Sequence, residues 1–75
     1  MNRYPVVSSS ITSVGYSASA RVLDVEFRLG EVYRYFDVEP ERFLALLDSP
    51  SKGQHVNGFI KRQYRFQRVT GVMPW

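Results

Sequence analysis

The sequence predicts one small α+β domain: a three-stranded antiparallel meander packed by two C-terminal helices, with a short fourth strand left open near the end (β-β-β-α-α-(β)). Three observations predict it. The chain has 75 residues, about half of the usual ~150 residues per domain, so it holds one domain. Before residue 36, apolar and polar residues alternate as in half-buried strands. After residue 40, apolar residues recur every three or four positions, as along one helix face.

The three predicted strands are residues 10–16, 21–27 and 31–36. The first is rich in β-branched side chains, and the second alternates so that Leu23, Val25 and Phe27 share one face. The core is expected to span about residues 8–68, and residues 1–7 are expected to form an arm.

The loop between the second and third strands decides which side chains share a face. A two-residue loop would place Arg34 beside the apolar side chains of the second strand. A three-residue loop with Gly30 in a left-handed bulge pairs Phe27 with Glu31 instead. The facing pairs are then Leu23 with Tyr35, Val25 with Tyr33, and Asp24 with Arg34. This register is predicted, because it groups four large apolar side chains and matches opposite charges.

The first predicted helix begins near Pro40, which has no N–H to leave unpaired in the first turn, and ends at Ser49-Pro50. Its expected buried stripe consists of Phe43, Leu44, Leu46 and Leu47.

Ser51 is a candidate cap for a second helix. The apolar positions of that helix are Val56, Phe59, Ile60 and then Gln63 or Tyr64. Residues 64–69 fit a short edge strand. Residues 70–75 form a tail, for which fraying and docking of Trp75 are both open.

Several classes of site are disfavoured by composition. The chain has no cysteine, so neither a disulfide nor a thiolate metal site is available. His55, the single histidine, cannot build an imidazole metal site alone. Ser51 lies one helical turn before His55, and no acid follows Asp48 in the sequence to orient the imidazole, although Asp24, Glu26 or Asp37 could do so in the fold. We therefore expect no enzyme, no cofactor and no metal.

No signal peptide or membrane span is evident in the sequence. The longest apolar run is residues 43–47, far short of the ~20 residues that a span needs. A cytoplasmic protein is expected.

The charge is unevenly distributed. Residues 51–75 carry five Lys and Arg and no acid, whereas residues 1–50 carry five Arg and seven acids. A basic segment with interleaved rings is typical of surfaces that bind single-stranded nucleic acid. The candidate RNA-binding residues are Lys52, Lys61, Arg62, Tyr64, Arg65 and Arg68. Two other interpretations stay open: a solvated surface that keeps the protein soluble, and a protein-interaction module that uses an edge strand and the tail.

Tyr33 and Tyr35 could stack on unpaired bases, but the predicted register assigns them to the core.

The chain resembles the KTSC domain family over about residues 8–68. The residues that carry this resemblance are Ser10-Ile11, Gly15-Tyr16, Leu23-x-Val25-x-Phe27, Gly30, Tyr33-x-Tyr35, Val38, Phe43, Ser51-x-Gly53, Asn57-x-x-Ile60 and Tyr64.

The family occurs as a stand-alone bacterial protein and at the C-terminus of some lysyl-tRNA synthetases. The resemblance therefore implies an RNA-binding role, with tRNA or single-stranded RNA as partner. Three positions depart from the family pattern, namely Leu29, Val56 and Lys61.

Overall fold

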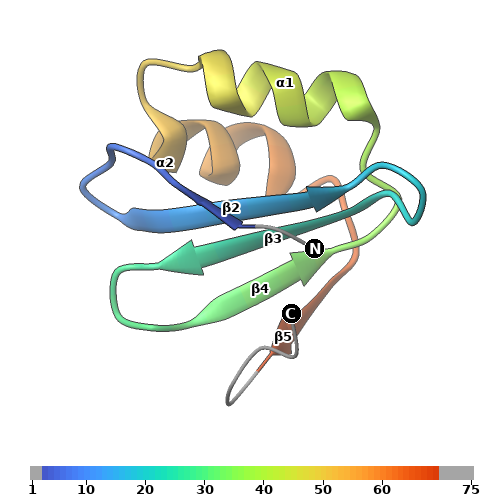
Figure 1. The fold of residues 1–75 in the computed structure, drawn as a ribbon, viewed down its shortest axis with the longest axis horizontal. Helices are drawn as coiled ribbons and strands as arrows, with labels where there is room; N and C mark the ends of the chain where they lie inside the picture. Colours follow the sequence, from blue (N-terminus) through green and yellow to red (C-terminus); the bar gives the residue numbers. More distant parts are fainter. Residues whose placement is uncertain (1–2, 70–75) are drawn as a thin grey trace.

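The computed structural model describes residues 3–69 and shows one five-stranded antiparallel sheet with the helices on one face (Figure 1). The strands, in spatial as well as chain order, are β1 (Arg3–Pro5), β2 (Ile11–Ser17), β3 (Val22–Phe27), β4 (Val32–Tyr35) and β5 (Phe66–Val69). The helical segments are α1 (Pro40–Asp48), α2 (Lys52–His55) and a π-helix, η1 (Val56–Ile60). The α+β class is confirmed, whereas the predicted three-stranded sheet is too small.

Two strands extend the sheet beyond the predicted meander. β1 lies within the expected arm and pairs with residues 13–15 of β2. Three residues are too few to show an alternating pattern in the sequence. Backbone pairing with a neighbouring strand holds them in the strand conformation instead. β5 pairs with β4 and gives residues 66–69 the edge-strand conformation that the sequence left open. The docking of Trp75 lies outside the described residues.

The predicted register of the β3–β4 hairpin is confirmed. The facing pairs include Leu23 with Tyr35, Asp24 with Arg34, and Val25 with Tyr33. The loop closes through a backbone hydrogen bond of 2.8 Å from the Phe27 N–H to the Glu31 carbonyl. Gly30 has a φ of +93°, a conformation that residues with a Cβ rarely adopt.

Replacing Gly30 by valine is expected to lower the free energy of unfolding by about 1–2 kcal/mol, since the left-handed backbone strains a β-branched residue. An added Cβ would meet nothing within 4 Å, so a loss of stability would report strain in the backbone and not a steric clash at Cβ. Gly58→Ala is the control, because its Cβ also meets nothing within 4 Å and its φ is not left-handed. Urea unfolding of the two variants would contradict the prediction if Gly30→Val kept the wild-type midpoint.

The core lies between the sheet and the helices. Its fully buried apolar residues are Ile11, Val14, Leu23, Val25, Tyr35, Val38, Leu46, Val56 and Ile60. The predicted stripe of the first helix is wrong at two positions, because Leu44 is 61% and Leu47 is 38% exposed. A short helix touches a sheet along one narrow line, so only Leu46 and the half-buried Phe43 of this stripe pack inward. Phe43 stacks on Tyr16, with 4.8 Å between the ring centroids.

The second helix is shorter than its apolar pattern predicts. After one α-helical turn it widens into η1, where the Lys61 N–H donates to the Val56 carbonyl at 2.7 Å. Residues 61–64 then form a turn, so the expected helix through Tyr64 is wrong. Gly58, a poor helix former, lies inside η1. Phe59 is half-exposed rather than buried, and Ser51 occupies the N-cap position without a side-chain capping hydrogen bond.

Candidate nucleic-acid interface

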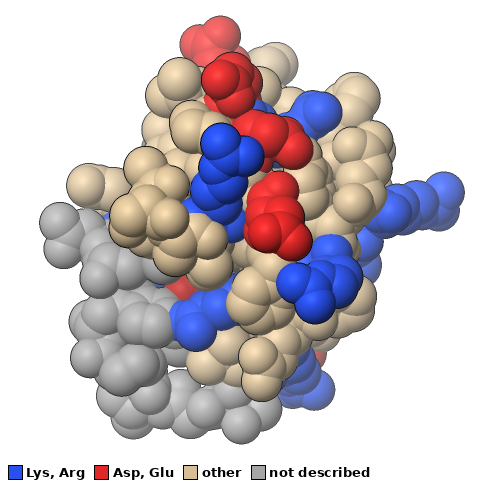
Figure 2. Space-filling view, turned by 90° about the vertical axis from the view of Figure 1, so that its right-hand side faces the viewer, with Lys and Arg blue, Asp and Glu red and all other residues tan. Residues whose placement is uncertain are grey.

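Two of the predicted RNA-binding cations are paired with acids from other segments. Arg65 lies 3.5 Å from the Asp37 carboxylate, and Arg68 lies 3.2 Å from that of Glu31. Figure 2 shows the side of the molecule on which blue and red side chains stand close together, without a uniform basic patch among the described residues. The acid-free stretch of sequence therefore does not form an acid-free surface.

Tyr64 and Lys52 are each held by a hydrogen bond. The Tyr64 hydroxyl donates to the Glu39 carboxylate at 2.7 Å, and burial together with this bond raises the pKa of Tyr64. The half-buried Lys52 donates from Nζ to the Ser49 carbonyl at 3.1 Å. A backbone carbonyl carries no net charge, so the positive charge of Lys52 is not neutralised by this contact.

Lys61 and Arg62 are the two predicted cations that stay exposed and form no ion pair with an acid within residues 3–69. They lie in the turn that follows η1, outside any helix, whereas the apolar pattern predicted a helix through Gln63 or Tyr64. The six predicted residues therefore differ in their contacts. Arg65 and Arg68 pair with acids, whereas Lys52, Lys61 and Arg62 form no ion pair with an acid within residues 3–69. Tyr64 is hydrogen-bonded to Glu39.

Two adjoining hollows lie where the β3–β4 hairpin meets the loop before β2. The serine hollow, of about 520 Å³, is lined by residues 7–10, Arg28, residues 50–54 and Asn57. The aromatic hollow, of about 400 Å³, is lined by Ser9, Ser10, residues 27–29, Glu31, Tyr33 and Lys61. Because Ser9, Ser10 and Arg28 line both hollows, the two adjoin each other, and together they are called the depression.

Arg28 was missed by the sequence argument, which counted charge by segment and placed this residue in the net-negative part. The side-chain Nε and Nη2 of Arg28 donate to the Ser8 carbonyl at 3.3 and 2.7 Å. The backbone N–H of Arg28 donates to the Ser10 carbonyl at 2.9 Å. The hairpin thus holds the guanidinium against the serine-rich loop. In the sequence, the feature that could have pointed to this hollow is the run of three consecutive serines at residues 8–10.

The two tyrosines of β4 differ in their surroundings. Tyr35 is 1% exposed, and burial raises its pKa to about 12, so its hydroxyl stays neutral. Tyr33 is half-buried and packs edge-on against Phe27 and Phe66, with ring centroids 5.6 Å apart in each pair. The predicted core position is confirmed for Tyr35, while Tyr33 also lines the aromatic hollow.

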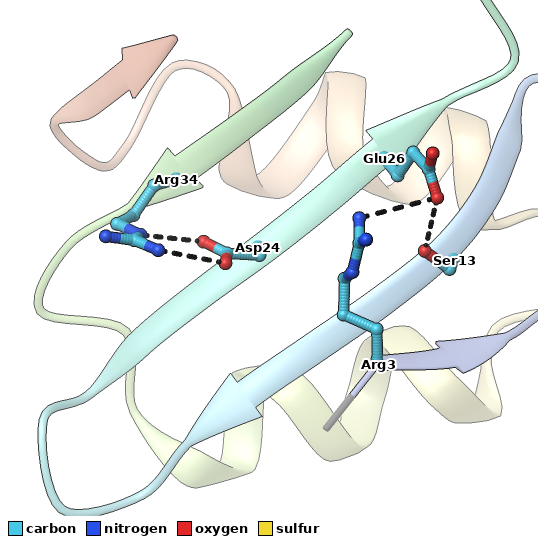
Figure 3. Close-up of polar contacts among 5 residues, drawn as sticks. All are labelled: Arg3, Ser13, Asp24, Glu26 and Arg34. Carbon is cyan, nitrogen blue, oxygen red and sulfur yellow. Dashed lines mark hydrogen bonds and ion pairs between the residues drawn. The ribbon is translucent and has the colours of Figure 1, made fainter. Parts of the chain in front are cut away.

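The sheet face opposite the helices carries polar pairs (Figure 3). Arg34 donates to both carboxylate oxygens of Asp24, at 3.0 and 3.3 Å. Glu26 accepts a hydrogen bond of 2.8 Å from Ser13 and lies 3.5 Å from Arg3. Asp24 is fully buried, and desolvation raises its pKa although Arg34 opposes the shift. These contacts link β1, β2 and β4 to β3.

His55 has the surroundings of a packing residue. Its ring lies 5.0 Å from that of Phe59, its Nε2 is buried without a hydrogen-bond partner, and burial lowers its pKa. The His55 backbone N–H donates to the Ser51 carbonyl at 3.0 Å, which is the backbone hydrogen bond of the helix. Within residues 3–69, no cluster of three or more acids and histidines could hold a metal ion. No helix in this range is long and apolar enough to cross a membrane.

Comparison with known proteins gives a consistent family assignment. The family model of the KTSC domain matches residues 7–64. An uncharacterized protein of Stutzerimonas stutzeri is 44% identical over 70 residues, which cover 92% of this chain and 99% of the relative. A lysine–tRNA ligase of Nostoc punctiforme is 40% identical over 62 residues, 83% of this chain and 11% of the ligase. The crystal structure of a KTSC domain protein from Yersinia pestis matches with a TM-score of 0.87 and 33% identity, covering 92% of this chain and 97% of that one.

Proposed function

The chain belongs to the KTSC domain family, and we propose that it is a small RNA-binding module that contacts single-stranded RNA with cations at the hairpin end of its sheet. The family assignment supplies the fold and no activity. An RNA partner is supported by the relative named lysine–tRNA ligase, which contains a segment similar to this chain.

One observation carries the proposal: Arg28, Lys52 and Lys61 come from three separate segments and line one depression. Glu31 is the single acid among the lining residues of the two hollows, and Arg68 lies against it. Phosphate binding is favoured where cations gather without competing carboxylates. The exposed Arg62 follows Lys61 directly in the turn after η1.

The double variant Lys61→Gln/Arg62→Gln is expected to weaken binding of a mixed-sequence single-stranded RNA about tenfold at low salt. Each phosphate contact contributes about −0.7 to the log–log salt slope on single strands, so the slope should flatten by about 1.4. Fluorescence anisotropy across a salt series measures both quantities. Both side chains are exposed, so circular dichroism should show an unchanged fold.

Two single variants with equal charge loss provide the matched comparison. Arg21→Gln removes a cation just before β3, whereas Lys61 lies near the hairpin after β3, at the other end of that strand. Lys61→Gln should weaken binding and Arg21→Gln should leave it nearly unchanged. Equal effects would reduce the proposal to unspecific charge attraction. An absence of any RNA-dependent change in amide NMR signals at millimolar RNA would rule it out.

The protein-interaction alternative is favoured by a different surface. Leu44 and Leu47 expose apolar area on α1 beside a shallow hollow, and such exposure often marks a contact with another protein. If RNA does not bind, this helix face is the next surface to test. A Leu44→Lys substitution would then separate partner binding from folding.

A further inference from the structure

We infer that the serine hollow and the aromatic hollow together hold a single nucleotide, with its phosphate in the serine hollow and its base in the aromatic hollow. This inference rests on the proposed RNA function and names the unit of RNA that the depression takes. Individual ligand sites commonly enclose about 300–1,000 Å³, and the two hollows measure about 520 and 400 Å³. A depression of this size suits one nucleotide rather than a duplex.

The serine hollow has the chemistry of a phosphate site. Arg28 and Lys52 contribute two positive charges, and no carboxylate is among the lining residues. The hydroxyls of the serine-rich loop and the side-chain amide of Asn57 add neutral hydrogen-bond donors. An arginine fork also binds phosphate oxygens through two donors at once.

Arg28 is held in place before any ligand binds. Its Nε and Nη2 each donate to the Ser8 carbonyl, which leaves Nη1 with two N–H donors for a ligand. Because this side chain is already fixed, binding an anion would cost little additional conformational entropy.

Close approach of two segments shapes the serine hollow. A Cβ added at Gly53 would lie 2.2 Å from the Ser10 hydroxyl oxygen, so the start of α2 approaches the loop at a distance that only glycine permits without rotation of that serine. Ser10, Ser51, Gly53 and Asn57, four of the residues that carry the resemblance to the family, all line this hollow. None of them belongs to the apolar core.

The aromatic hollow has the chemistry of a base site. Phe27 and Tyr33 are half-buried and meet edge to face, while Leu29 is 91% exposed at the rim. Nucleic-acid bases of any sequence stack on such surfaces. The acid in this hollow, Glu31, pairs with Arg68, which offsets its repulsion of a nearby phosphate.

The test is an NMR titration of the isotope-labelled full chain with four probes. The probes are adenosine 5′-monophosphate, uridine 5′-monophosphate, inorganic phosphate and adenosine. The nucleotides should shift the amide signals of Gly53 and Asn57, which line the serine hollow alone, together with those of Leu29 and Lys61, which line the aromatic hollow alone. Phosphate alone should shift the first pair, and adenosine alone the second, each with weaker affinity.

Variants then test the phosphate contacts. Arg28→Gln and Lys52→Gln should each weaken nucleotide binding about tenfold, and Arg21→Gln should not change it. Two variants are used because Arg28 also anchors the loop. If Arg28→Gln disturbs the fold, Lys52→Gln still decides the matter. Wild-type affinity in Lys52→Gln would overturn the assignment of the phosphate.

The outcomes separate this inference from the proposed function. If single-stranded RNA binds but its shifts avoid both hollows, the nucleotide site is wrong and RNA binding stands. If mononucleotides bind in the hollows but RNA does not, the nucleotide site is supported and the RNA-binding function is wrong. If neither class of probe shifts any signal at millimolar concentration, both are wrong.

Discussion

Replacing Leu23 by alanine is expected to lower the free energy of unfolding by about 2–5 kcal/mol, because the truncation leaves a cavity in a closely packed core. Leu23 is fully buried in β3 and lies opposite Tyr35. Small domains of this kind have a total stability of about 5–15 kcal/mol, so the loss is a large fraction of it. Urea unfolding followed by circular dichroism measures the change.

Leu29→Ala is the matched control for this substitution. It removes the same atoms from a side chain that is 91% exposed, and its stability should change by no more than about 0.5 kcal/mol. Equal losses for the two variants would contradict the core position of β3. A loss below 1 kcal/mol for Leu23→Ala would do so as well.

Replacing Arg34 by methionine is expected to cost about 3–5 kcal/mol at neutral pH, because it leaves the buried Asp24 carboxylate without the guanidinium that accompanies it. Methionine keeps much of the apolar length of the arginine stem. Urea unfolding at about pH 7 and about pH 5 measures the loss and its dependence on protonation.

The sign of the pH dependence follows from the pKa of Asp24, which desolvation already raises. A carboxyl with a higher pKa in the folded state binds a proton on folding, so its contribution to stability is present below the unfolded pKa and is lost as the pH rises through the folded pKa. Arg34 opposes this shift, so its removal raises the pKa of Asp24 further. The deficit of the variant should therefore shrink as the pH falls through that raised value.

The double variant Asp24→Asn/Arg34→Met completes the comparison. It should recover most of the stability that Arg34→Met loses at neutral pH, because no charge is left buried in the pair. A deficit that is the same at both pH values and in the double variant would show that Arg34 acts through packing rather than through the Asp24 carboxylate.

The hairpin and the start of the first helix were predictable because their determinants are local. Alternation along β3 and β4, together with a left-handed position at Gly30, leaves one register that buries the apolar side chains. Pro40 marks the first turn of α1 through the geometry of its own ring. Each of these signals lies within a few residues of the structure that it specifies.

Burial along the helices and the pairing of β1 were decided by tertiary contacts. Helical periodicity identifies a face of α1, but the width of the buried stripe depends on how the helix lies over the sheet, and this leaves Leu44 exposed. Similarly, β1 is a strand because β2 offers it a free edge. Neither arrangement can be read from residues adjacent in the chain.

The candidate site shows the same division for charge. The sequence by itself determined which residues are cations, and two of its candidates, Lys52 and Lys61, line the depression. Only the tertiary structure decided that Arg65 meets Asp37 and that Arg28 joins the depression. Net charge adds along a chain regardless of folding, but electrostatic interactions depend on distance in space. Acids from other segments can therefore neutralise a basic stretch, and a cation from an acidic stretch can complete a basic surface.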